Sequence, residues 1–233
     1  MSIKIRIKFA KYGAMKFIGH LDMMRFFQKA IRRAGIDIRY SEGFSPHQIM
    51  SFAAPLGVGI ESRGEYMDIE VVSMTSTEDM KQALNQAMVE GVDVLSVSVL
   101  QDNAKNAMSS VAAASYRLKM KEGDFPIVDL ISQLCNFYEQ EKIPYTKETK
   151  KNVMELDLKQ GIYEIGADAD GSIHMLVNAS SSGNIKPTMV FGKFCEFVGI
   201  EIPVSAYQVT RLETYTDLAK EGEAHQFVPL ASV

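Results

Sequence analysis

The side chains best suited to chemistry in this sequence are two histidines, His20 and His47, together with Asp22. Imidazole gains and loses a proton near neutral pH, so either histidine could serve as a general acid or base. Histidine and carboxylate side chains also suit divalent metal ions as ligands. Asp22 has a simpler role available, because an acidic residue in the first turn of a helix complements the positive end of the helix dipole. Since these side chains lie on separate elements, we expect no bound metal and no cofactor.

Positive charge is concentrated in the same part of the chain. Residues 1–60 contain ten lysines and arginines and three acidic residues, a net charge of +7, whereas the whole chain carries −4, which leaves −11 for the remainder. Such an asymmetry indicates an anionic partner for the first segment, because a basic surface attracts phosphates. A solvated basic face that only keeps the protein soluble has the same composition, so both interpretations stay open.

Four of these cations, Arg25, Lys29, Arg32 and Arg33, recur at i, i+4, i+7 and i+8. This spacing places them on the face of a helix opposite its apolar positions. There they either stay solvated or contact the phosphate backbone of a nucleic acid, which cations bind without reading the sequence. The predicted RNA-binding set is completed by three residues that follow the helix: Arg39, Ser45 and His47.

The elements that position these residues follow from periodicity. Apolar residues alternate with cations over residues 3–9, the period of a strand with one buried face. Its cations, Lys4, Arg6 and Lys8, extend the basic surface only if their face of the sheet stays open. A helix over 20–34 is ended by Gly35. The other elements expected here are strands at 36–40, 66–72 and 92–100, a loop at 41–47, an extended piece at 49–53, and a helix at 77–88 preceded by a capping box of Thr75 and Glu78.

The order β-α-β-β-α-β is that of a ferredoxin-like unit, and a second unit with one extra strand follows. Its expected elements are a strand at 114–121, a helix at 126–139, strands at 153–158, 162–167 and 173–177 joined by turns, a helix at 187–198 and a strand at 206–212. The predicted fold class is therefore α+β, with two tandem ferredoxin-like units and mainly antiparallel sheets. The predicted organisation is a first unit at 1–102 with a basic N-terminal segment, a linker at 103–112, a second unit at 113–216 and a loose tail at 217–233.

Four sequence blocks in the first unit carry a family resemblance. They cover residues 19–22, 40–47, 51–62 and 64–68. In these blocks the chain resembles the radical-SAM-linked protein family, a domain of unknown function that occurs alone or fused behind a cobalamin-type radical SAM protein. One departure is visible, because the family usually has a cation shortly after the Pro-His pair, where this chain has Gln48 and Ile49. The motif residues are Gly19, His20, Asp22, Gly43, Phe44, Pro46, Ser51, Phe52, Pro55, Gly59, Glu65, Tyr66 and Asp68.

The resemblance implies an accessory protein that serves a partner radical SAM enzyme, with RNA as its substrate, because family members tend to be encoded near ribosomal proteins and RNA-processing proteins. It implies no established reaction. The chain has only two cysteines, Cys135 and Cys195, both predicted to lie in the core. A radical SAM cluster needs three closely spaced cysteines as iron ligands, so this chain is not itself the radical enzyme.

Three functions from different classes therefore stay open. The first is a binding protein that presents an anionic substrate, RNA, to a partner radical SAM protein. The second is a metal-independent RNA-processing enzyme in which His20 or His47 is the acid or base and Lys29 or Arg32 holds the phosphate. The third is a protein-interaction module that uses the loops at 41–64.

Composition excludes several other classes. The chain has no run of about 18 apolar residues, so no membrane-spanning helix is expected. Its first residues alternate cations with apolar side chains, unlike a secretory signal, and two cysteines are too few for a disulfide framework. We therefore expect a cytoplasmic protein without a membrane partner.

Overall fold

The structure is a computed structural model, and it describes residues 2–121, 132–148 and 153–233. It divides into two compact units: unit 1 comprises Met1–Ala112 and Glu213–Val233, and unit 2 comprises Ala113–Leu212. Both units mix helices with mostly antiparallel strands, which confirms the α+β class. No helix in the described part of the chain is long and apolar enough to cross a membrane.

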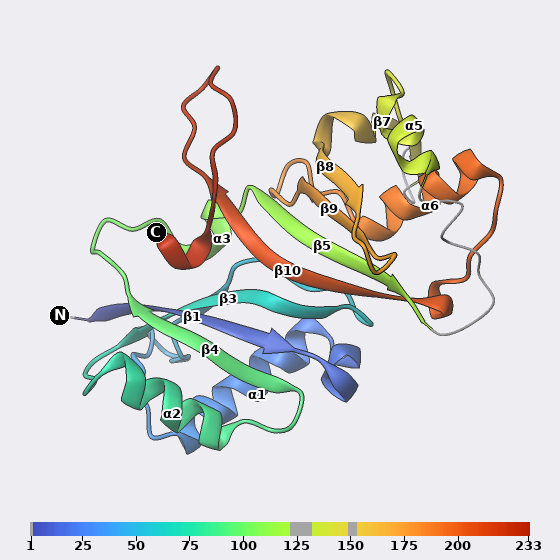
Figure 1. The fold of residues 1–233 in the computed structure, drawn as a ribbon. Helices are drawn as coiled ribbons and strands as arrows, with labels where there is room; N and C mark the ends of the chain where they lie inside the picture. Colours follow the sequence, from blue (N-terminus) through green and yellow to red (C-terminus); the bar gives the residue numbers. More distant parts are fainter. Residues whose placement is uncertain (1, 122–131, 149–152) are drawn as a thin grey trace. The chain divides into compact units, whose positions relative to one another are not determined.

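Unit 1 contains an antiparallel sheet in which the strands follow the order β4-β1-β3, and β2 pairs with the outer edge of β3. Helices α1 and α2 both lie on the same face of this sheet (Figure 1). A short 3-10 helix, η1 (Gly13–Phe17), precedes α1. The bounds are β1 (Ile3–Lys11), α1 (His20–Arg33), β2 (Met50–Phe52), β3 (Glu61–Val71), α2 (Thr77–Ala87) and β4 (Val92–Val99).

The core of unit 1 forms where the apolar face of β1 meets the apolar face of α1. Ile5, Ile7 and Phe9 alternate along the strand and are buried, as are Phe27 and Ile31 on the helix. The rings of Phe9 and Phe27 pack edge to face with their centroids 4.7 Å apart. Burying a side chain of this size contributes about 1.5–3 kcal/mol, so this interface fixes which face of α1 is left to solvent.

Two predicted boundaries in unit 1 need correction. Helix α2 is capped by Ser76, whose Oγ accepts the Asp79 backbone N–H at 3.0 Å, so the expected capping box of Thr75 and Glu78 was wrong. The strand expected at 36–40 does not form, because Ile38 bridges to Val71 in β3 whereas the next bridge runs to Gln48. A segment that changes partner after two residues cannot build a ladder.

The segment expected as a linker, 103–112, is docked on unit 1. It contains a single helical turn, α3 (Ala107–Ser110), capped by Asn106, whose Oδ1 accepts the Ser109 N–H. Ala107 is fully buried, and its N–H donates to Asp68 Oδ2. Burial of the small side chains and this hydrogen bond explain why the polar composition did not produce a free linker.

Residues 217–233, expected as a loose tail, are also structured. The end of β10 (Tyr207–Asp217) pairs with β11 (Phe227–Pro229), and a 3-10 helix, η4 (Leu230–Ser232), follows. Leu230 is completely buried, so apolar burial holds this segment on unit 1.

Unit 2 has a sheet with the order β10-β5-β9-β8, and β6 and β7 form a separate two-stranded sheet. The helix predicted at 126–139 is confirmed over α5, and its first residues, 126–131, lie outside the described part. Strand β7 pairs with β6 instead of turning into β8, because 158–161 form a 3-10 helix. The bounds are β5 (Ala113–Met120), α5 (Gln133–Glu139), β6 (Pro144–Glu148), β7 (Val153–Asp157), β8 (Ile162–Ala167), β9 (Ile173–Asn178) and α6 (Pro187–Val198).

The two cysteines differ in environment. Cys195 lies in the core as predicted, and burial raises the pKa of its thiol to about 11. Cys135 is exposed, so its predicted core position was wrong. The buried stripe of α5 runs through Leu134 and Phe137, and Cys135 lies one residue away from that stripe.

Candidate nucleic-acid interface

The outer face of α1 carries four exposed cations: Arg25, Lys29, Arg32 and Arg33. Arg25 forms an exposed ion pair with Asp22 at 3.1 Å, a type of pair that contributes at most about 1 kcal/mol. Arg32 and Arg33 donate to the backbone carbonyls of Gln28 and Ala87. Lys29 makes no ion pair or hydrogen bond with any described residue. All four cations therefore remain available to an anionic ligand.

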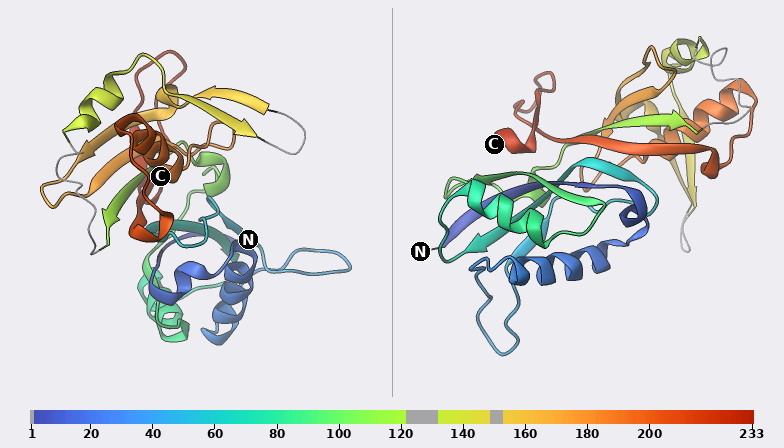
Figure 2. Two further views of the ribbon diagram at one scale, coloured as in Figure 1. Left: turned by 90° about the vertical axis from the view of Figure 1, so that its right-hand side faces the viewer. Right: turned by 60° about the horizontal axis from the view of Figure 1, so that its bottom comes forward.

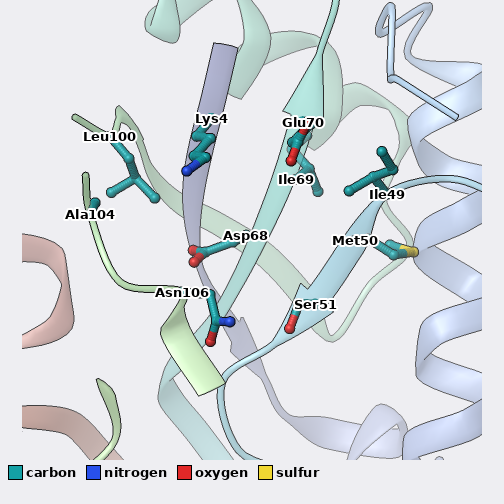
Figure 3. Close-up of a pocket in the computed structure, with 10 residues that line it drawn as sticks. All are labelled: Lys4, Ile49, Met50, Ser51, Asp68, Ile69, Glu70, Leu100, Ala104 and Asn106. Atoms are coloured by element: carbon teal, nitrogen blue, oxygen red, sulfur yellow. The ribbon is translucent and has the colours of Figure 1, made fainter. Parts of the chain in front are cut away.

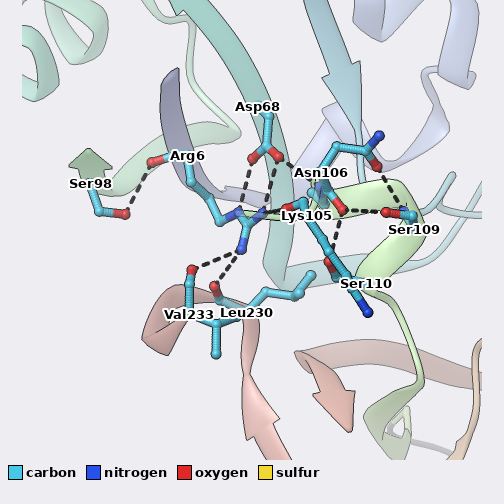
Figure 4. A network of polar contacts seen from close by, with 10 residues as sticks. Arg6, Asp68, Ser98, Lys105, Asn106, Ser109, Ser110, Leu230 and Val233 are labelled. Atoms are coloured by element: carbon cyan, nitrogen blue, oxygen red, sulfur yellow. Dashed lines mark hydrogen bonds and ion pairs between the residues drawn. The ribbon is translucent and has the colours of Figure 1, made fainter. Parts of the chain in front are cut away.

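The cations of β1 do not form a second open surface. Arg6 has a relative exposure of only 1%, and each of its five N–H groups has an acceptor (Figure 4). It donates twice to Asp68, at 2.9 and 3.1 Å, and at 3.0 Å to the carbonyls of Lys105, Leu230 and Val233. Since guanidinium has five donors, this side chain is saturated and cannot also bind a phosphate. Arg6 instead joins β1, β3, the segment before α3 and the C-terminal segment.

Lys8 is neutralised in a similar way. Its Nζ pairs with Glu213, and the same carboxylate accepts the Tyr66 hydroxyl at 2.7 Å. Burial of Tyr66, followed by its bond to Glu213, raises the pKa of this phenol well above its usual value. Lys4 and Lys11 donate to the carbonyls of Asp102 and Ile18. The motif residues Tyr66 and Asp68 therefore belong to an internal network of unit 1.

The block at 40–47 forms a hairpin that projects away from the body of unit 1, as both views in Figure 2 show in blue. Its base is closed by backbone hydrogen bonds from Ser41 N to His47 O, 2.8 Å, and from Ile49 N to Arg39 O, 2.9 Å. Gly43 at the tip has a φ of +110°, a conformation that favours glycine. Beside it, Phe44 has a relative exposure of 107%, so its ring is fully in solvent.

The base of this hairpin contacts the third turn of α1. Gln48 is buried, with a relative exposure of 5%, and its Nε2 donates at 3.3 Å to the carbonyl of Gln28, which also accepts from Arg32 Nε. Gln48 Nε2 lies 3.4 Å from Tyr40 Oη, whereas Gln48 Oε1 has no partner among the described residues. Gln48 thus attaches the hairpin to α1 beside Lys29 and Arg32.

The three candidate chemical side chains occupy different environments. His20 is half-buried, with its ring edge-on to Phe52 at a centroid distance of 5.4 Å. Asp22 is exposed in the first turn of α1 and pairs with Arg25. His47 is exposed on the hairpin, where its Nδ1 lies 2.8 Å from Ser41 Oγ. Within the described residues, no group of three His, Cys, Asp or Glu side chains could hold a metal ion.

The remaining predicted residues of this region are held by neighbours. Arg39 pairs with Glu70 at 2.9 Å and lies 3.8 Å from Glu42, so much of its charge is compensated. Gly59 has a φ of +86°, and its N–H donates to Lys16 O at 2.9 Å. The glycines at 57 and 59 therefore make a tight turn, and this N–H is already used within the chain.

Sequence reasoning did not identify a cavity of about 380 Å³ beside β2 and β3 (Figure 3). The register between these strands places Ser51 opposite Asp68, and both line the cavity. Its charged walls are compensated, because Asp68 is bound by Arg6, and Glu70 by Arg39. Ser51 and Asp68 both belong to the motif blocks, so the sequence pointed to these two residues but not to the cavity that they line. The remaining lining residues are Lys4, Ile49, Met50, Ile69, Glu70, Leu100, Ala104 and Asn106.

Residues 4–187 match the family model DUF2344, described as an uncharacterized protein conserved in bacteria. The chain belongs to this family. The part of the chain that matches DUF2344 includes α1, the hairpin and all four motif blocks. No curated protein matches the chain. Among solved structures, it is similar to an unknown protein from Galdieria sulphuraria, with 10% identity, a TM-score of 0.27, and coverage of 91% of this chain and 99% of that one.

Proposed function

We propose that this chain is a cytoplasmic RNA-binding accessory protein, which holds an anionic substrate on unit 1 and presents it to a partner radical SAM enzyme. The observation that carries the proposal is the pair of neighbouring features on unit 1. Four exposed cations on one face of α1 adjoin a projecting hairpin, whereas the cations of β1 are used internally. Of these two elements, α1 and not β1 therefore offers positive charge to a phosphate.

Electrostatics favours a polyanion as the ligand of this surface. The chain as a whole is acidic, with a net charge of −4, so nonspecific attraction to nucleic acid is weak and the local field of α1 decides binding. A phosphate contact by Lys or Arg releases a counterion, with a salt slope of about −0.7 for each contact on a single strand. Four contacts would give a slope of about −3.

The partner and the fold type are part of the same proposal. A radical SAM protein is proposed as the partner on the family resemblance of the motif blocks, and the two cysteines of this chain cannot supply a three-cysteine cluster. We further propose that unit 1 is a ferredoxin-like unit. The sheet order β4-β1-β3 with β2 beside β3, and the two helices on one face, support this.

The enzyme alternative has one specific observation in its favour. His47 is exposed and directly precedes Gln48, which is bonded to α1, and its Nδ1 lies 2.8 Å from Ser41 Oγ and 3.4 Å from Ser45 O, contacts that orient the ring. His20, packed on Phe52, is the weaker candidate. RNA cleavage that is lost in His47→Ala would favour the enzyme, whereas intact RNA in both proteins favours binding alone.

The binding proposal is tested by fluorescence anisotropy with a labelled RNA that contains both stem and loop. The variant Lys29→Gln/Arg32→Gln removes two charges from the basic face and should weaken binding about tenfold at 0.1 M salt. Its matched control is Lys142→Gln/Lys220→Gln, which removes two exposed lysines elsewhere. Equal affinity of the two variants, or no binding by the wild type, contradicts the proposal.

A further inference from the structure

We propose that Phe44 is a base-stacking residue, so that the surface of α1 and the hairpin takes an unpaired nucleotide of single-stranded RNA and not a duplex. This inference rests on the proposed function and narrows its substrate class. The basic surface alone does not explain why the aromatic ring of Phe44 is exposed to solvent.

The exposure of Phe44 is the first reason. No described residue covers its ring, which has a relative exposure of 107%, whereas the other phenylalanines on α1 and β1 are buried or half-buried. A large apolar side chain at the tip of a projecting loop contributes nothing to the core of unit 1. Its exposed π face is, however, the feature that stacks against a nucleic-acid base, whichever base that is.

The hairpin holds this ring in a defined place. Two backbone hydrogen bonds close its base, and Ser41 Oγ accepts the His47 N–H at 3.1 Å. The left-handed Gly43 lets the chain reverse at the tip without strain from a side chain. The base of the hairpin is also bonded to α1 through Gln48. The hairpin therefore loses little conformational freedom when a ligand binds to the ring of Phe44.

The position of the cations favours a nucleic-acid strand over an apolar protein pocket. The hairpin base meets α1 at Gln28, directly before Lys29 and one turn before Arg32. Phe44 at the tip of the hairpin lies four residues from Gln48, which is at most about 13 Å even at the rise of an extended strand. One acidic side chain, Glu42, lies at the tip, and it is 3.8 Å from Arg39. A single RNA strand whose phosphates contact α1 can therefore stack one nucleobase on the ring of Phe44.

A duplex cannot satisfy both features. Its bases are stacked on each other, so the ring of Phe44 would face sugar and phosphate, and only the cations would contribute. A single strand offers phosphates and free base faces together, which is the combination used by proteins that bind unpaired nucleic acid. Preference for single strands over duplex thus separates this inference from simple charge attraction.

The chain contains no tryptophan, which makes Phe44→Trp a single fluorescent reporter. We expect oligouridine or oligoadenosine to quench its emission, and a blunt RNA duplex of equal phosphate number to leave the emission unchanged. Phe44→Leu, which keeps apolar bulk but removes the π face, should weaken single-strand binding about tenfold and leave duplex binding unchanged. Because Phe44 is exposed, the thermal unfolding midpoint should not move.

Phe17→Leu is the matched control. Phe17 is also an exposed aromatic residue of unit 1 with a lysine beside it, but it precedes α1 and lies outside the hairpin. The inference is overturned if Phe44→Leu binds single strands as the wild type does, if Phe17→Leu loses as much affinity, or if the duplex quenches equally. RNA binding that depends on Lys29 and Arg32 but not on Phe44 would leave the proposed function standing. Absence of all RNA binding would end both proposals.

Discussion

Strand β1 and helix α1 each carry four cations, and the fold uses the two sets differently. The cations of β1 all have internal acceptors, among them Asp68 and Glu213, which lie 62 and 205 residues further along the chain. The cations of α1 are exposed, and their contacts are local pairs or carbonyls. A strand inside a sheet is covered by whatever the chain places on its second face, whereas the outer face of a helix on that sheet stays in water.

A charge count therefore locates basic residues but not basic surface. The net charge of +7 in residues 1–60 is partly consumed in folding, because Arg6 and Lys8 act as cross-links between distant segments. Binding charge and structural charge can therefore be separated by mutation. Four single substitutions test that separation.

Arg6→Met should have the largest effect on stability. It removes the ion-pair partner of the largely buried Asp68 carboxylate, which keeps only the Ala107 N–H, and it leaves three carbonyls without their donor; breaking a buried pair in this way costs about 3–5 kcal/mol. Chemical denaturation measures the free energy of unfolding. Arg6→Lys, which retains charge but has three donors instead of five, should show an intermediate loss. A loss below about 1 kcal/mol for Arg6→Met would mean that this cation behaves like an exposed one.

Leu230→Ala should come next, because it tests whether the last residues hold unit 1 together. Leu230 is completely buried, and such a truncation costs about 2–5 kcal/mol. Leu218→Ala is the control, since Leu218 is half exposed and its truncation should change the free energy of unfolding by less than about 0.5 kcal/mol. Equal effects of the two substitutions would indicate a tail that is loose in solution.

Tyr66→Phe should change the pH dependence of stability. Burial and the bond to Glu213 raise the pKa of Tyr66, so the native state holds this proton more tightly than the unfolded state does. The bound proton stabilises the native state fully below the pKa of tyrosine in the unfolded chain, about 10. Above that pH the free energy of unfolding falls by about 1.4 kcal/mol per pH unit. Urea unfolding at pH 9 to 11 should give a steeper decline for the wild type than for the variant. Parallel curves would contradict the buried network around Glu213.

Ser41→Ala should have the smallest effect. It removes the Ser41 Oγ contacts with the N–H and ring of His47 while the backbone closure of the hairpin remains. Single-strand RNA affinity should fall two- to threefold, about 0.5 kcal/mol, because the hairpin must be ordered on binding. The free energy of unfolding should stay within about 0.5 kcal/mol of the wild type. An unchanged RNA affinity would show that hairpin order does not matter for binding.

Periodicity predicted the local elements of unit 1 well. The alternation over residues 3–9 and the helical spacing from Met23 to Ile31 identified β1, α1 and the buried face of each, because local apolar patterns determine which side packs. Those patterns also placed Arg25, Lys29, Arg32 and Arg33 on the exposed side. The sequence therefore predicted the exposure of these four cations correctly, whereas their binding of RNA stays a prediction.

The rest depends on contacts that no local pattern contains. Nothing near Arg6 in sequence indicates that Leu230 and Val233 supply its acceptors, and nothing near residue 217 indicates that the following segment pairs and packs. Phe44 was recognised as a motif residue, but its exposure follows from the projection of the hairpin, which is decided by the bridge between Tyr40 and Gln48. Long-range partners decided the first two outcomes, and a bridge between residues eight positions apart decided the third.

The division between binding and structural charge is tested most directly by the salt dependence of RNA binding in two variants. One is Arg25→Gln/Lys29→Gln/Arg32→Gln/Arg33→Gln, which removes the four cations of α1, and the other is Lys8→Gln, which removes one cation of β1. The wild type and Lys8→Gln should share a slope of about −3 in the logarithm of affinity against the logarithm of salt, although Lys8→Gln is less stable. The α1 variant should bind weakly, with a slope near zero and unchanged stability. A slope that survives in the α1 variant, or disappears in Lys8→Gln, would contradict the division between binding and structural charge.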